Sequence, residues 1–209
     1  KAAFSYAEDS EKFDYDIKNS SLLFTNESYT IDNELKNTMI DVSFSSPIGE
    51  ASSINFGYAG EFGNIPFSLK ESADLFSLEY LEDVHAAFAT FDHESDKFYY
   101  ELGLRAEFVN TLIDYHTLPD IERSYEDLFP SAYVNMMLSD TKYLYFSYSK
   151  SIQRPTYTEL QPFEQKISET LAYKGNEQLM PVYADQLEMG YTYSSNKFTL
   201  STVAFYHIY

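Results

Sequence analysis

A two-residue alternation of apolar and polar side chains is the feature that most limits how this chain can fold. Between residues 98 and 108 every second side chain is apolar, namely Phe98, Tyr100, Leu102, Leu104, Ala106 and Phe108, and those between them are mostly polar. Successive side chains of a β-strand point to opposite faces of its sheet, so this is the pattern of a strand with one apolar face. It recurs over 54–62 and, less regularly, over 198–208. These segments lack the apolar spacing of an amphipathic helix, and we predict an all-β fold.

The predicted connections between strands alternate between short and long. Ten antiparallel strands are expected at 1–6, 12–20, 37–46, 51–62, 82–91, 97–109, 130–139, 142–151, 184–194 and 197–209. The short connections are 7–11, 47–50, 92–96, 140–141 and 195–196, and the long ones are 21–36, 63–81, 110–129 and 152–183. Outer-membrane barrels combine short periplasmic turns with long extracellular loops. The pattern therefore predicts the wall of an antiparallel transmembrane β-barrel, oriented in that way.

Composition narrows the function. The 33 acidic against 14 basic residues give a net charge of −19, which excludes nucleic-acid binding as the main activity. The chain has 37 Tyr and Phe residues in total, many near predicted strand ends, where barrels carry aromatic girdles at the membrane interface. The alternative for these aromatics is the core of a soluble β-domain, such as a hydrolase.

No catalytic or metal-binding pattern is present in the sequence. Cysteine is absent, the four histidines show no His-x-His or His-x-x-x-His spacing, and there is no Gly-x-Ser-x-Gly elbow or phosphate-binding glycine loop. We expect no enzymatic activity, no metal and no cofactor.

Several motifs in a fixed order carry a resemblance to a known family. Residues 144–163 run Leu-Tyr-Phe-Ser-Tyr-Ser-Lys-Ser-Ile-Gln-Arg-Pro-Thr-Tyr-Thr-Glu-Leu-Gln-Pro-Phe, followed by Gly-Asn-Glu-Gln-Leu-Met-Pro-Val at 175–182 and Leu-Glu-Met-Gly-Tyr at 187–191. Upstream, 103–107 run Gly-Leu-Arg-Ala-Glu. This set resembles the β-barrel of TonB-dependent outer-membrane receptors, in the form common in Bacteroidetes. The chain departs from the family pattern at Gln161 (usually Asn), Glu177 (usually Pro) and Ala106 (usually Tyr).

The resemblance implies a larger protein around this chain. Family members resemble a 22-stranded barrel filled by a plug, so residues 1–209 are expected to be an internal part of a single barrel domain, without the plug and the remaining strands. The implied function is energised uptake of a scarce nutrient across the bacterial outer membrane. The implied partners are outer-membrane lipid, the TonB complex acting through the plug, a small-molecule or oligomeric nutrient, and a SusD-like surface lipoprotein. A structural or secretion-associated barrel without import activity is the alternative.

Candidate ligand contacts follow from the predicted lumen and from the longest connection. Polar residues opposite the apolar face of 98–108 would line the lumen, and in the connection 152–183 several aromatic and polar residues could face the barrel mouth. The candidates are Glu101, Arg105, Glu107, Arg154, Tyr157, Phe163, Tyr173 and Asn176. Arg154 could instead anchor a turn through a salt bridge. The prolines and apolar residues of 152–183 predict a loop that folds over the barrel mouth, and the stretch 164–172 allows a short helix.

Overall fold

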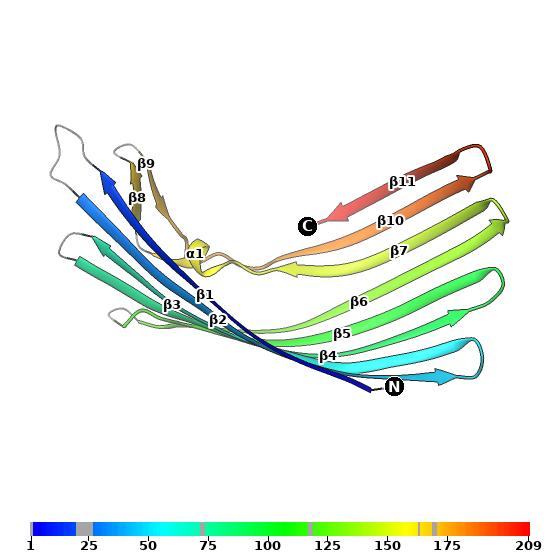
Figure 1. Ribbon diagram of the computed structural model, residues 1–209, viewed down its shortest axis with the longest axis horizontal. Helices are drawn as coiled ribbons and strands as arrows, with labels where there is room; N and C mark the ends of the chain where they lie inside the picture. Colours follow the sequence, from blue (N-terminus) through cyan, green and yellow to red (C-terminus); the bar gives the residue numbers. More distant parts are fainter. Residues whose placement is uncertain (1, 20–26, 72–73, 117–118, 163, 169–170) are drawn as a thin grey trace.

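Nine antiparallel strands form one bent sheet in a computed structural model of the protein (Figure 1), in the order β1-β2-β3-β4-β5-β6-β7-β10-β11. The structure describes residues 2–19, 27–71, 74–116, 119–162, 164–168 and 171–209. The strands are β1 (Ala2–Asn19), β2 (Glu27–Ile48), β3 (Ser52–Glu71), β4 (Asp74–Glu94), β5 (Phe98–Asp114), β6 (Ile121–Ser139), β7 (Lys142–Gln153), β10 (Val182–Ser194) and β11 (Thr199–Ile208). The predicted all-β, up-and-down antiparallel wall is confirmed.

Three smaller elements lie between β7 and β10. They are α1 (Tyr157–Leu160), β8 (Glu164–Ser168) and β9 (Leu171–Lys174), and β8 pairs with β9 in a separate two-stranded sheet. All three lie inside the bend of the main sheet (Figure 1). Among the described residues, no helix is long and apolar enough to cross a membrane.

The predicted strand count and three predicted loops were wrong. The expected turn at 7–11 does not exist, because β1 pairs with β2 without interruption from Ala2 opposite Phe44 to Asn19 opposite Glu27. The regions 21–36, 63–81 and 110–129, expected as long loops, are mostly extensions of strands β2 to β6. In these extensions the apolar positions change from the outer to the inner face, as at Phe67, Leu78 and Ile113, so a search for one continuous apolar face ends the strands too early. Among the connections that the structure describes, 152–183 alone remains long, and the strict alternation of connection lengths therefore fails.

The apolar side chains of β5 lie on the exposed, outer face of the sheet. Phe98, Leu102, Leu104 and Phe108 are each 49–51% exposed. The next outward position beyond Phe108 is Asn110, so the apolar band ends there. The opposite, inner face carries Glu101, Arg105 and Glu107, and beyond the band it carries Val109, Ile113 and Tyr115, which are each 1% exposed.

The buried core lies on the inner face, beyond the apolar band. It consists of Phe67 from β3, Leu78 and Tyr80 from β4, Ile113 and Tyr115 near the end of β5, and Leu160 from α1. The segment after β7 therefore packs on the inner face of the wall. The predicted folding back holds for Tyr157 and Leu160, whereas Leu171 and Tyr173 stay exposed and Phe163 lies outside the described residues.

Candidate functional site

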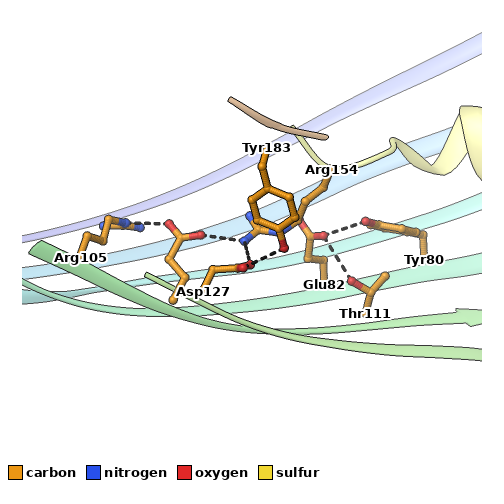
Figure 2. Close-up of polar contacts among 8 residues, drawn as sticks. Tyr80, Glu82, Arg105, Thr111, Asp127, Arg154 and Tyr183 are labelled. Carbon is orange, nitrogen blue, oxygen red and sulfur yellow. Dashed lines mark hydrogen bonds and ion pairs between the residues drawn. The ribbon is translucent and has the colours of Figure 1, made fainter. Parts of the chain in front are cut away.

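A chain of charged side chains crosses the inner face between β5 and the ends of β7 and β10. Arg105 Nε donates to Glu107 Oε1 at 2.7 Å, and Arg154 Nη2 lies 2.8 Å from Glu107 Oε2. Arg154 Nη2 also lies 3.8 Å from Asp127 Oδ2 of β6. The Tyr183 hydroxyl donates to Asp127 Oδ1 at 2.8 Å. Figure 2 shows these contacts, with Arg154 between the two carboxylates.

The backbone explains why Arg154 occupies this position. The ladder between β6 and β7 ends at Ser131 opposite Ser149, and the next residue of β6 is Pro130, which has no N–H to donate. From there β7 stays paired with β10 alone, as far as Gln153 opposite Val182. Arg154 and Tyr183, at the free ends of this pair, bridge back to β6 through side chains.

Burial strengthens the ion pairs of Arg154. The side chains of Arg154, Glu107 and Asp127 are only 18%, 11% and 12% exposed. Opposite charges that are removed from water attract strongly, but each must keep its partner, because an unpaired buried charge is costly. The cluster therefore fixes the end of β7 to β5 and β6.

A second carboxylate, Glu82, lies beyond the apolar band on the same face. It accepts hydrogen bonds from the Tyr80 hydroxyl at 2.8 Å and from Thr111 Oγ1 at 3.4 Å (Figure 2). Burial, and then the neighbouring Glu82 carboxylate, raise the pKa of Tyr80 well above its ordinary value. Tyr80 is therefore a permanent donor at neutral pH, and this group supports the buried core.

The connection between β7 and β10 forms a folded segment, which we call the strap. Its described parts are a first limb (154–162), the β8–β9 hairpin and a second limb (175–181). In the first limb, Leu160 is 2% exposed, and the Tyr157 ring lies 6.1 Å from that of Phe67 and 6.2 Å from that of Tyr80.

A local hydrogen-bonded cap explains the single helical turn of the first limb. The Glu159 carboxylate accepts hydrogen bonds from the backbone N–H and from the hydroxyl of Thr156, both at 2.9 Å. These bonds, that of the backbone first, hold the pKa of Glu159 below its ordinary value. Such an arrangement satisfies N–H groups that a helix start leaves without partners.

The second limb is tied to the first and to the wall. Asn176 N donates to Glu159 O at 2.6 Å, and the Tyr173 hydroxyl donates to Thr158 O at 3.0 Å. From β6, Arg123 Nη1 donates to Leu179 O at 2.6 Å, and Arg123 Nη2 donates to Glu177 O. The strap is therefore attached to the wall at both ends.

The structure brings together three of the eight candidate ligand contacts. Arg105, Glu107 and Arg154 form the ion-pair cluster, whereas Glu101 lies apart and accepts a hydrogen bond from the Tyr99 hydroxyl at 3.1 Å. The remaining candidates belong to the strap. Tyr157 packs against the apolar core, Tyr173 ties the hairpin to the first limb, Asn176 ties the two limbs together, and Phe163 lies outside the described residues. A ligand-binding role for any of them stays a prediction.

The allowed helix over 164–172 is wrong, because this stretch contributes to the β8–β9 hairpin and the helical turn lies earlier, at Tyr157–Leu160. Sequence reasoning also missed Arg123, Asp127 and Tyr183. The first two lay in a presumed loop, although their spacing of every second residue with Tyr125 and Phe129 is a strand signal. In the described part of the chain, no three His, Asp or Glu residues are grouped so as to hold a metal ion.

Comparison with known proteins identifies the family. The model of the outer membrane protein beta-barrel family matches residues 1–208. The chain belongs to this family. A search of curated proteins found no match.

Solved structures with the same fold include two transporters and an outer-membrane receptor. The unliganded ferric citrate transporter FecA is 14% identical with a TM-score of 0.61, and the match covers 98% of this chain and 31% of FecA. The copper transporter OprC is 12% identical with a TM-score of 0.68, covering 99% and 34%. The alcaligin receptor FauA from Bordetella pertussis is 15% identical with a TM-score of 0.65, covering 97% and 37%.

The chain thus spans about a third of the length of these structures. It is part of the wall of an outer-membrane β-barrel. The TonB-dependent receptor resemblance that the motifs predicted is confirmed, and so is the outer-membrane location.

Proposed function

We propose that the protein containing this wall imports a scarce nutrient across the outer membrane, driven by the TonB complex acting through a plug domain. The observation that carries the proposal is the family match along residues 1–208, joined to the fold of transporters of ferric citrate and copper. The inner polar face supports it, because a lumen lined by charged groups suits a water-soluble solute. A total of 22 strands is part of this proposal.

The strap would form part of the outer mouth in this proposal. The strap side would face the cell exterior, and the turns at 49–51, 95–97, 140–141 and 195–198 would face the periplasm, as in other outer-membrane barrels. Arg105, Glu107, Arg154, Tyr173 and Asn176 would then lie along the path of the ligand. A SusD-like lipoprotein would be the surface partner if the nutrient is a glycan or a peptide.

The test is nutrient-limited growth of a strain that lacks the complete receptor gene. The panel would contain ferric siderophores, copper, cobalamin, glycans and peptides as the limiting nutrient. We expect a growth defect on one nutrient class, restored by the intact gene and reproduced by loss of TonB. Normal growth on the whole panel, together with a defect in secretion or envelope integrity, would instead support the structural or secretion-associated alternative.

A further inference from the structure

The two limbs of the strap are joined to one another as well as to the wall. Asn176 N donates to Glu159 O at 2.6 Å, directly beside Gly175. A β-carbon on Gly175 would lie 2.5 Å from Glu159 O and 2.6 Å from Gln161 O, which are both main-chain atoms. The limbs therefore pack closer than any residue with a side chain would allow, and movement of one limb must move the other.

Each limb is joined to the wall by one arginine, which belongs to the limb itself in one case and to β6 in the other. Arg154 of the first limb forms an ion pair with Glu107, and Arg123 of β6 donates hydrogen bonds to the carbonyl oxygens of Glu177 and Leu179 in the second limb. A guanidinium group is suited to this, because its rigid fork presents several donors at once and remains charged at any physiological pH.

Between the Arg154 and Arg123 contacts, buried side chains fill the space between the strap and the wall. Leu160 is buried among side chains of β4 and β5, and Tyr115 lies beneath the second limb. Burial, and then the carboxylate of Glu177, raise the pKa of Tyr115 above its ordinary value. The inner surface of β3 to β5 beyond the apolar band is thus covered by the strap.

We propose that Arg123 and Arg154 are paired latches that hold the strap as one fixed piece, and that Arg123 is a positioning residue for the barrel mouth. A solute entering the mouth meets the exposed side of the strap, which carries Tyr173 and Asn176, and does not meet the covered wall. A strap held in this way gives the mouth one shape in the absence of a solute. This use of the strap rests on the proposed import function, whereas the latching does not.

The test is a distance measurement in the complete receptor, reconstituted in lipid without any ligand. Nitroxide labels at Lys174→Cys on the strap and Glu126→Cys on the exposed face of β6 report the strap position by pulsed electron paramagnetic resonance. We expect one narrow distance distribution for the otherwise unchanged protein. Arg123→Gln should widen it by about twofold or more, because the second limb loses its charge-assisted hydrogen bonds. Arg123→Lys should widen it as well, because a single ammonium cannot reproduce the fork.

Matched controls separate a latch from a general loss of structure. Lys142→Gln removes a positive charge at the far end of β7 and should leave the distribution narrow. The barrel of every variant is checked by its resistance to denaturation in sodium dodecyl sulfate before boiling. A narrow distribution in a folded Arg123→Gln receptor would overturn the proposal, and full rescue by Arg123→Lys would show that charge alone holds the limb and overturn the fork latch. Failure of the growth test would leave these distances unchanged, so the two proposals fail independently.

Discussion

The charges around Arg154 act as a set, and a single change in the set leaves a charge without its partner. Arg154 lies between Glu107 and Asp127, and all three are largely shielded from water. The motif around Arg154 could not predict these partners, because Glu107 is 47 residues away in the chain. Sequence reasoning could offer a salt bridge for Arg154, but the partner depended on register, which the presumed loop over 110–129 concealed.

We expect Arg154→Met to lower the free energy of unfolding by about 3 kcal/mol, because Asp127 loses its cation and Glu107 keeps only Arg105. Adding Asp127→Asn to this variant should recover part of the loss, since the carboxylate left without a cation is then neutral. Denaturant titrations of the receptor and its single and double variants in detergent measure both quantities. Purely additive effects of the two substitutions would contradict the coupling.

Gly175 offers a second test at the residue scale. Gly175→Ala should cost about 1–3 kcal/mol locally, since the new β-carbon would meet main-chain oxygens that cannot turn aside. The matched control is Gly63→Ala, where the nearest atom to a new β-carbon is 3.8 Å away, an ordinary contact. Hydrogen exchange over the strap should accelerate in the first variant and not in the second. Equal exchange in both would show that the limbs separate easily.

At the scale of the strand, alternation predicted the elements well wherever one face meets the apolar band. β5 is the clearest case: its predicted span 97–109 begins one residue before β5 (Phe98–Asp114) and ends five residues before its end, and both of its faces were assigned from the sequence. Prediction failed for the extensions, such as 63–71 of β3, because the apolar positions change there from the outer to the inner face, where Phe67 joins the buried core and Ile65 packs against it. It failed in the same way for β1, where acidic residues at 8–11 looked like a turn.

The two faces of β5 should respond differently to substitution. Leu102→Arg places a charge on the exposed apolar face and should cost about 2–4 kcal/mol in a folding titration into lipid. Glu101→Gln on the inner face should cost much less, because a neutral amide can still accept the hydrogen bond of Tyr99. Similar costs for the two changes would mean that the outer face does not contact hydrocarbon.

The strap should be dispensable for assembly of the wall. Replacing 158–180 with a short Gly-Ser linker leaves the ladder of β7 and β10 intact from Lys142 to Gln153. The variant should reach the outer membrane and fold, although the core residues beneath the strap become exposed. Outer-membrane fractionation together with gel mobility before and after boiling checks this. Loss of assembly would mean that the strap is needed to form the wall.

On the scale of the whole molecule, the edge of the apolar band runs obliquely across the strands. The first outward amide, carboxylate or ammonium groups beyond the band are Lys36, Asn64, Asp83, Asn110 and Glu126, on β2 to β6 in turn. In the register, this edge shifts by four residues over four strand spacings, which is about 13 Å along the strands for about 19 Å across them. The strands are therefore tilted by about 35° from the membrane normal, as in outer-membrane barrels.

The strap and the turns at 49–51, 95–97, 140–141 and 195–198 lie at opposite ends of the strands (Figure 1), so we expect them on opposite sides of the membrane. Cysteines introduced at Glu122 and Lys174 should react with an impermeant maleimide on intact cells, whereas those at Glu50, Glu94 and Ser195 should react only after the outer membrane is opened. The chain has no cysteine of its own to interfere. Mixed reactivity within either group would contradict the orientation, and complete reversal would place the strap in the periplasm.

Pro130 has a consequence for how such receptors can diversify. The rim of an ordinary barrel has a circumference set by strand number, because each strand is held at a fixed spacing from the next. Past Pro130, β6 and β7 have no shared ladder in the described residues, and the join is made by Arg154 and Tyr183. Side chains of other lengths at these two positions would set a wider or narrower rim on an unchanged set of strands. In this wall the width of the rim could therefore change by substitution at these two positions while the number of strands stays the same.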